Sequence, residues 1–273
     1  HIVISNNYFE ENYSDLICIE GGIGEMIQHI EIHNNVLPGS SGKSIELSYV
    51  NNVEISNNHI NNFAQAIDIE HSNNVLIEYN TIENGYGFGL EISSNFPQTN
   101  MFIVGNKITG VSNADGIRIL GENVQVVNNF IQTEGIADKS GIFISDNSDN
   151  CKLYYNSINV ISTNSVSSAV CLDNAENMDI RNNIFSNSGN GYSAILENIP
   201  TNIIIDYNNY YSFSVNGFQI SGNDYQLLNS WQTAIGNDAN SININPFFET
   251  ISNLRPFQRE LNGAGITIPS IIY

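Results

Sequence analysis

Short runs that alternate apolar and polar residues recur along the chain, and each is followed by an asparagine at a fixed distance. The stretch VEISNNHINN at residues 53–62 is one copy, in which Asn58 comes three residues after the apolar Ile55 and Ile60 resumes the alternation. The same frame places an asparagine at Asn7, Asn35, Asn58, Asn80, Asn106, Asn129, Asn156, Asn183 and Asn208. Consecutive members are 22 to 28 residues apart, so a unit of about 25 residues is repeated nine times.

A second apolar alternation lies inside most of these units. It reads SIEL at 44–47, AIDI at 66–69, GLEI at 89–92, GIRI at 116–119, GIFI at 141–144 and AVCL at 169–172. Alternation with a period of two residues predicts strands, and residues 1–215 contain no stripe of helical period. Short strands in a repeat of this length predict a solenoid, in which each unit forms one coil and equivalent residues stack about 4.8 Å apart.

Equivalent inward positions of a solenoid form ladders. One predicted apolar ladder contains Ile45, Ile67, Leu90, Ile117 and Ile142, and a second contains Ile55, Ile77, Ile103 and Val126. Asparagine tolerates the left-handed backbone region, and its amide both donates and accepts hydrogen bonds. We therefore expect the repeated asparagine to turn each corner and to bond to the asparagines above and below, which is a structural role and not a catalytic one.

These repeats resemble the right-handed parallel β-helix proteins of the pectate lyase-like superfamily, over about residues 1–215. The resemblance implies an all-β fold, a right-handed parallel β-helix (solenoid) of about nine coils with a C-terminal capping segment. Enzymes, adhesins and phage tailspikes all use this fold, so the resemblance alone assigns no function.

Residues 216–273 differ from the repeats. The segments 223–248 and 253–269 resemble the C-terminal end of secreted β-helix proteins from Bacteroidetes, and this resemblance implies a secreted or cell-surface bacterial protein, with other domains in a longer parent chain. LLNSWQTAIG is the one segment predicted to be helical, and its Leu227, Leu228 and Trp231 are expected to cap the open end of the apolar core. We predict one domain, with repeats at 1–215 and a closing segment at 216–273.

The charge of the chain limits its partners. Eight Lys and Arg residues against 28 Asp and Glu residues give a formal net charge of -20. A surface that binds phosphates needs clustered cations, so nucleic acid and anionic membranes are poor partners, whereas Ca²⁺ and polar neutral ligands fit better. No apolar run is long enough for membrane insertion, and the three cysteines have no zinc-site spacing.

The outward positions of the second strand are the candidate site. Read along the stack, they place Glu46, Asp68 and Glu91 on adjacent coils, followed by Arg118, with Glu70 and His71 beside them. Carboxylates at this spacing repel one another, and three explanations stay open. The face is a solvated acidic surface; or Glu46, Asp68, Glu70 and Glu91 bind Ca²⁺; or Glu46, Asp68, Glu91 and Arg118 catalyse the cleavage of a polysaccharide.

The motifs of known β-helix enzymes favour none of the catalytic alternatives. The Asn-Thr-Asp, Asp-Asp and Gly-His-Gly motifs of polygalacturonases do not occur in this sequence, and RPFQR at 255–259 has the wrong spacing for the pectate lyase pattern. Lyases of the chondroitinase B and alginate types use acidic Ca²⁺ ligands beside a lysine and an arginine. Arg118 suits that arginine, but Lys43 is only adjacent to the column, so the base stays unassigned.

Aromatic residues in the turns are a second candidate surface. Tyr86 and Phe88, with His71, are predicted to contact a sugar ligand, because exposed rings can stack on the faces of sugars. Phe63, Phe96 and Tyr192 lie in similar positions, where the alternative is that the rings close the turns over the core.

Two function classes follow from the sequence. The first is a secreted or cell-surface β-helix module with a structural and ligand-binding role, whose ligand is a polysaccharide. The second is a polysaccharide lyase or glycoside hydrolase that uses the acidic face. The absence of the hydrolase motifs and of a lysine on the column favours the first class, and the acidic column and the aromatic turns keep the second open.

Overall fold

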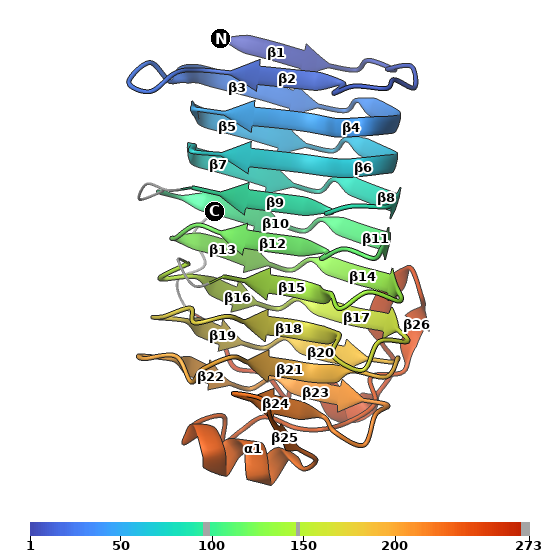
Figure 1. Ribbon diagram of the computed structural model, residues 1–273, viewed down its shortest axis with the longest axis vertical. Helices are drawn as coiled ribbons and strands as arrows, with labels where there is room; N and C mark the ends of the chain where they lie inside the picture. Colours follow the sequence, from blue (N-terminus) through green and yellow to red (C-terminus); the bar gives the residue numbers. More distant parts are fainter. Residues whose placement is uncertain (95–98, 146–147, 269–273) are drawn as a thin grey trace.

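The computed structural model describes residues 1–94, 99–145 and 148–268, and over most of this length the chain winds into a right-handed parallel β-helix. Each complete coil contributes one strand to each of three faces, here called sheets 1, 2 and 3 (Figure 1). The predicted all-β class, the handedness and the number of coils are confirmed, since sheet 1 has nine strands in parallel register.

Sheet 1 contains the strands that precede each asparagine corner. They are β1 (Ile2–Ser5), β3 (Ile27–His33), β5 (Val50–Ser56), β7 (Asn73–Glu78), β10 (Met101–Val104), β13 (Val124–Val127), β16 (Lys152–Tyr154), β19 (Asp179–Arg181) and β22 (Ile204–Asp206).

Sheet 2 follows the corner, and sheet 3 follows sheet 2. Two long strands, β4 (Val36–Ser48) and β6 (His59–Glu70), run through both sheets. The other strands of sheet 2 are β8 (Thr81–Gly85), β11 (Lys107–Ser112), β14 (Phe130–Gly135), β17 (Ser157–Ser162), β20 (Ile184–Asn187) and β23 (Asn209–Ser212). The other strands of sheet 3 are β2 (Ile17–Glu20), β9 (Leu90–Ser93), β12 (Ile117–Leu120), β15 (Ser140–Ile144), β18 (Ser168–Leu172), β21 (Tyr192–Leu196), β24 (Phe218–Ile220) and the antiparallel β25 (Asn223–Tyr225).

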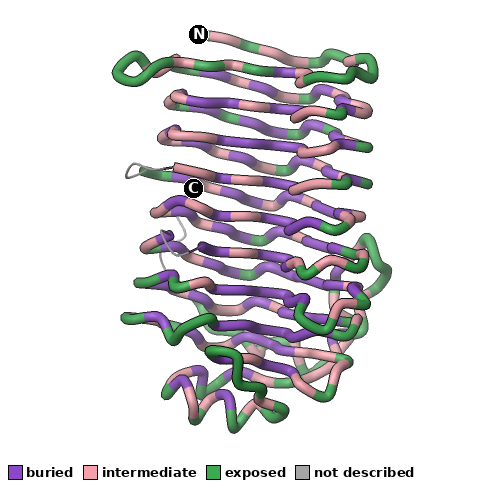
Figure 2. Tube along the Cα trace, in the orientation of Figure 1, coloured by how far each residue is buried: buried purple, intermediate pink, exposed green. Residues whose placement is uncertain are grey.

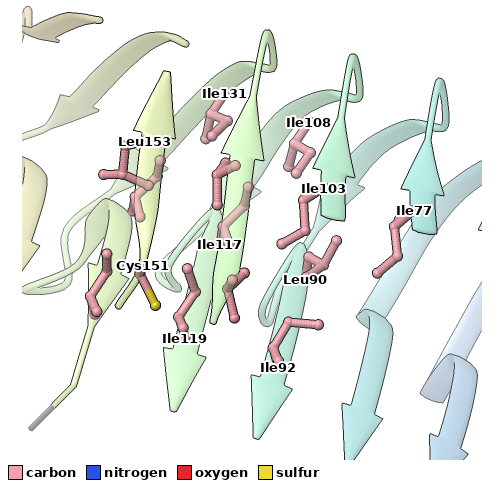
Figure 3. Packing of buried hydrophobic residues seen from close by; sticks show 14 of the residues in the cluster. Ile77, Leu90, Ile92, Ile103, Ile108, Ile117, Ile119, Ile131, Cys151 and Leu153 are labelled. Carbon is pink, nitrogen blue, oxygen red and sulfur yellow. The ribbon is translucent and has the colours of Figure 1, made fainter. Parts of the chain in front are cut away.

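The predicted apolar ladders are confirmed. Ile55, Ile77 and Ile103 pair in register in sheet 1, and Ile67, Leu90 and Ile117 pair in register in sheet 3. Figure 2 shows buried positions running through the strands of the successive coils after the first strand, and Figure 3 shows the side chains of the two ladders meeting inside the coil. The members of both ladders are buried, so the apolar positions of the alternation are the residues that face the interior of the solenoid.

Two neighbouring residues form each corner, although the sequence predicted that one asparagine would both turn the chain and make the hydrogen bonds. Asn58 is buried and donates from Nδ2 to Oδ1 of Asn80 at 3.0 Å, which continues a ladder that runs from Asn7 to Asn208. The left-handed backbone belongs to the residue before it, Asn57, whose φ is 56°. The expectation that the ladder asparagine itself adopts this conformation is therefore wrong. The buried amide is needed for hydrogen bonds, and its exposed neighbour takes the positive φ, as Tyr79 also does.

Glycine precedes several strands of sheet 3 because the chain of the next coil is too close for a side chain. A Cβ at Gly116 would lie 2.4 Å from Cγ2 of Ile131, and a Cβ at Gly89 would lie 2.5 Å from the carbonyl oxygen of Gly116. Sheet 3 lies so close to the neighbouring chain at these positions that a side chain would not fit, which explains the repeated glycine before the apolar alternation.

The end of the solenoid opposite the N-terminus is covered by α1 (Leu228–Ile235) (Figure 1). Trp231 is fully buried and stacks on Phe218 with ring centroids 4.9 Å apart. Leu228 packs partly against the core, but Leu227 is 62% exposed, so its predicted role in the cap is wrong. The predicted boundary between the repeats and the closing segment stays a prediction.

The last residues of the described chain run back along the stack. After β26 (Phe248–Thr250), β27 (Asn253–Pro256) and a 3-10 helix (Arg259–Leu261), the main chain of Ile266 makes two hydrogen bonds to the side chain of Asn182. Ile268 packs on the outer side of sheet 1 against Val104, Val127 and Tyr154. We call residues 262–268 the strap, because they attach the last described residues to earlier coils.

Candidate functional site

The charged column predicted on sheet 3 is a continuous row of neighbours. In strand register, Glu46 pairs with Asp68, Asp68 with Glu91, and Glu91 with Arg118. Cys18 precedes Glu46 in the same row. The outward positions were thus read correctly from the period of two residues, and the four side chains lie on consecutive coils.

Lys43 belongs to this cluster, although the sequence placed it only beside the column. An irregularity in the pairing of β4 with β6, between Ser40 and Lys43, sets the lysine where its side chain reaches the column. Its Nζ contacts Oδ2 of Asp68, lies 2.5 Å from Oε1 of Glu46 and 3.8 Å from Oε1 of Glu70. The ammonium therefore offsets the repulsion among the carboxylates.

Burial changes the acidity of the cluster. Asp68 is only 3% exposed, and burial raises the pKa of its carboxyl despite the hydrogen bond from Lys43. Burial, followed by the charge of Asp68, also raises the pKa of Glu91, whose Oε2 accepts a hydrogen bond from Gln65 at 2.9 Å. Burial lowers the pKa of Lys43, but its bonds to Asp68 and Glu46 outweigh this effect and the net pKa is raised, so Lys43 is an ammonium at neutral pH.

The guanidinium of Arg118 closes the column and is held by aromatic rings. Its Cζ lies 4.9 Å from the centroid of the Phe88 ring and 5.6 Å from that of Phe143. Nη1 is 3.7 Å from Oε1 of Glu91, which is an ion pair beyond hydrogen-bonding distance. Phe88 packs partly against the core and supports Arg118, and its predicted contact with ligand stays a prediction.

The predicted Ca²⁺ ligands are only partly brought together. Oxygen atoms of Glu46, Asp68 and Glu70 lie within 4.8 Å of one another, and Glu91 is outside this group. Hard carboxylate oxygens are the ligands that Ca²⁺ prefers. The ammonium of Lys43 already contacts all three carboxylates, so a divalent ion could bind them only if Lys43 moved away.

A hollow lies at the turn between sheets 2 and 3, next to the start of the column. It has a volume of about 570 Å³ and is lined by Glu11, Asn12, Tyr13, Gly39, Ser40, Ser41, Asn62, Ala64 and Tyr86. The rings of Tyr13 and Tyr86 are 97% and 78% exposed. The adjoining residues of the chain, Lys43 and Gln65, belong to the charged cluster, so we call this hollow and the column together the tyrosine–acid face.

The other residues of the predicted aromatic surface lie in different settings, and the ligand contact predicted for His71 stays a prediction. His71 lies 5.0 Å from the ring of Tyr49, measured between centroids. Phe63 is fully buried in the core and Tyr192 is buried, as the alternative explanation expected. Phe96 lies outside the described residues. Tyr13 was missed, and its signal was its place in the turn before a strand of the column.

A second hollow, of about 340 Å³, lies farther along sheet 3. It is lined by Asp115, Arg118, Asp138, Lys139, Ser140, Phe143, Val166, Ser168, Cys171, Ile195, Glu197 and Gln219. The sequence signal was present, because the outward row changes from acidic to apolar at Phe143 and Cys171, but sequence reasoning did not use it.

Comparisons with known proteins agree with this fold. A family model described as "Right handed beta helix region" matches residues 1–100. No curated protein sequence matches the chain. The chain is therefore defined as a right-handed parallel β-helix protein by its own architecture and by the family match over its first coils.

Solved structures with similar folds are distant in sequence. The A-modules of the Azotobacter vinelandii mannuronan C-5 epimerases AlgE6 and AlgE4 are 14% and 13% identical, with TM-scores of 0.46 and 0.45 and coverage of 80% and 70% of this chain. The catalytic domain of Agl-KA is 12% identical over 89% of this chain, with a TM-score of 0.44. The chain covers 65%, 60% and 55% of the lengths of these three proteins, which is less than two thirds of each.

Among the described residues, no helix is long and apolar enough to span a membrane.

Proposed function

We propose that this chain is a β-helix module of a secreted or cell-surface bacterial protein, and that it binds a polysaccharide on the tyrosine–acid face. The observation that carries the proposal is the hollow with two largely exposed tyrosine rings next to a row of carboxylates. Exposed rings offer apolar faces for sugars, and carboxylates accept hydrogen bonds from hydroxyl groups. The location rests on the resemblance of residues 223–269 to secreted β-helix proteins.

The electrostatics of the face favour a neutral polysaccharide. The protein has a net charge of -20, and the cluster holds Glu46, Asp68 and Glu70 around a single lysine. A strongly anionic polymer would meet repulsion at this place, whereas hydroxyl groups can bond to both the carboxylates and the ammonium.

The test is binding to a panel of soluble polysaccharides, measured by affinity electrophoresis and calorimetry. Tyr86→Ala should weaken binding about 3-fold to 10-fold, because an aromatic contact contributes about 0.5–1.5 kcal/mol beyond its buried area. Phe213→Ala is the matched control, since this ring is 73% exposed at the same kind of turn five coils farther along. Equal loss in both variants, or no binding to any polysaccharide, would refute the proposal.

A second candidate function is cleavage of the bound polysaccharide, and one observation favours it. Burial raises the pKa of two neighbouring carboxyls, Asp68 and Glu91, so one can hold a proton while the other is ionised. Such a pair suits acid–base hydrolysis. Lys43 is less suited to remove a proton, as a lyase base must, because its raised pKa keeps it charged.

Cleavage of the polysaccharide releases products, whereas binding alone does not. The same panel, read for reducing ends and for the absorbance of unsaturated uronates, separates hydrolysis, elimination and binding alone. Glu91→Gln should abolish cleavage while binding is retained if the second candidate is correct.

A further inference from the structure

We propose that the second hollow on sheet 3 is a separate binding site, which takes a single ring that has one apolar face and a carboxylate group. This site shares Arg118 with the charged column of the tyrosine–acid face, but none of the residues that line it line the tyrosine hollow. Its volume of about 340 Å³ is at the lower end of the range for small-molecule sites.

The floor of the hollow is apolar where the outer face of a solenoid is expected to be polar. Phe143, Cys171 and Ile195 pair in register at outward positions of β15, β18 and β21. With Tyr192 they form a cluster of their own, separate from the main core inside the coils. Cys171, Tyr192 and Ile195 are buried and Phe143 is partly exposed, so apolar side chains form the bottom of a hollow whose rim is polar, as in many ligand sites.

Arg118 forms one wall and has its hydrogen-bonding capacity unused. Its side chain makes no hydrogen bond to any residue in the described parts of the chain, since the ion pair with Glu91 is 3.7 Å long, and its Nε is enclosed without an acceptor. Phe88 and Phe143 hold the guanidinium in place. Arg181 provides the contrast, because it also lies over a ring, that of Tyr154, but donates from Nε and Nη2 to Asp179 at 2.6 Å each.

A guanidinium held by aromatic rings with donors to spare is suited to a planar carboxylate. Phe143 is part of the apolar floor and also contacts the guanidinium of Arg118, so the two features are adjacent. The occupant therefore needs an apolar face within a few ångströms of its carboxylate, and a ring acid satisfies this condition.

The remaining charges around the hollow are compatible with an anion beside Arg118. Lys139 lines the same end and forms no ion pair with the described residues. Asp115 accepts a hydrogen bond from the backbone of Ser140 at 2.8 Å, and burial raises the pKa of Asp115. Burial also raises the pKa of Asp138. Glu197 follows β21, three coils from Arg118, or roughly 14 Å along the stack.

The test is calorimetry with two carboxylate probes and their neutral counterparts, at about 0.15 M salt to screen the negative charge of the protein. Glucuronic acid is compared with glucose, and 4-hydroxybenzoate with 4-hydroxybenzamide, so that a sugar source and an aromatic source of the same chemistry are distinguished. We expect one carboxylate to bind with a dissociation constant of about 1 mM or lower, and its neutral counterpart to bind about 10-fold more weakly or worse.

Variants assign the binding to Arg118. Arg118→Gln should weaken the carboxylate about 10-fold or more and leave the weak binding of the neutral counterpart unchanged. Arg181→Gln is the matched control and should change neither. Lys139→Gln, on a partly exposed turn, should weaken the carboxylate a few-fold and keeps the test informative if the Arg118 variant folds poorly.

The proposal is overturned if neither carboxylate binds below about 10 mM, or if both charge variants bind as the unchanged protein does. The proposed polysaccharide function fails separately, because Tyr86→Ala acts on the other hollow and should leave carboxylate binding intact.

Discussion

Lys43 holds together a group of carboxylates that would otherwise repel one another. It contacts Glu46, Asp68 and Glu70, and Asp68 is almost completely buried. Removing one partner of such a pair leaves an uncompensated charge, which costs more than the pair contributes. The lysine is thus required by the buried aspartate, whatever the site binds.

We predict that Lys43→Met lowers the free energy of unfolding by about 3 kcal/mol at pH 7, the lower end for a buried ion pair, because the lysine side chain is 26% exposed. The loss should shrink as the pH falls, because Asp68, whose pKa is already raised, takes up a proton and no longer needs a counter-charge. Chemical unfolding at several pH values measures this effect. In an Asp68→Asn background the lysine substitution should cost much less, and an equal cost in both backgrounds would contradict the prediction.

The column could be predicted from the sequence, whereas Lys43 and the arginine contacts could not. The register of Glu46, Asp68 and Glu91 follows from the period of two residues and the spacing of the asparagines. Lys43 enters through an irregularity in strand pairing that no pattern of apolar residues records. The position of Arg118 was predicted, but its capture by Phe88 and Phe143 depends on side-chain contacts between three coils.

At the scale of the element, α1 closes the core through a buried carboxylate. Asp238 is buried, accepts a hydrogen bond from Nε1 of Trp231 at 2.9 Å and contacts the hydroxyl of Ser241. That hydroxyl accepts a hydrogen bond from the backbone of Asn208 at 2.7 Å, so the cap continues the asparagine ladder. The sequence predicted the helix and Trp231, but not the carboxylate, because nothing in the local pattern marks Asp238 as buried.

The cap should loosen as the pH rises. Burial raises the pKa of Asp238 to about 7, against an ordinary value of 3.8, although hydrogen bonds from Ser241 and Trp231 lower it. A raised folded-state pKa means that this contribution to stability is fully present below the unfolded value and is lost as the pH rises through about 7. Trp231 is the only tryptophan, so its fluorescence reports on the cap.

We expect the thermal midpoint followed by this fluorescence to fall between about pH 5 and pH 8, and Asp238→Asn to remove most of the dependence. Lys43→Met provides a control with an intact cap, in which the fluorescence-detected dependence on Asp238 should persist. A pH profile that is the same with Asp238 and with Asn at this position would contradict the assignment.

At the scale of the whole molecule, each coil contacts mainly its two neighbours. Asn106 and Asn129 occupy equivalent corners, 23 residues apart, and the strands between them pair with the coils on either side. Stability in such a stack is close to a sum over coils and their interfaces. This regularity is why the coil number and the strand register could be predicted from one sequence.

We predict that deletion of residues 107–129, one complete coil, leaves a folded β-helix with a lower midpoint of unfolding. The deletion removes two interfaces between coils and creates one, and it joins Asn106 to Phe130, which is in register with Lys107. Circular dichroism and thermal unfolding test this outcome. Deletion of residues 107–118 is the control, since it shifts the register and should abolish folding; comparable unfolding in both would contradict the prediction.

The strap changes how the molecule would respond to mechanical force. Asn182 binds the main chain of Ile266 at both its N–H and its carbonyl, and the hydroxyl of Tyr155 donates to the same carbonyl. A load applied at residue 268 therefore reaches the seventh and eighth of the nine asparagine corners before it reaches α1. The strand hydrogen bonds of the coils at these corners then carry the force in parallel. The last coil, which would otherwise be pulled off first, bears less of it.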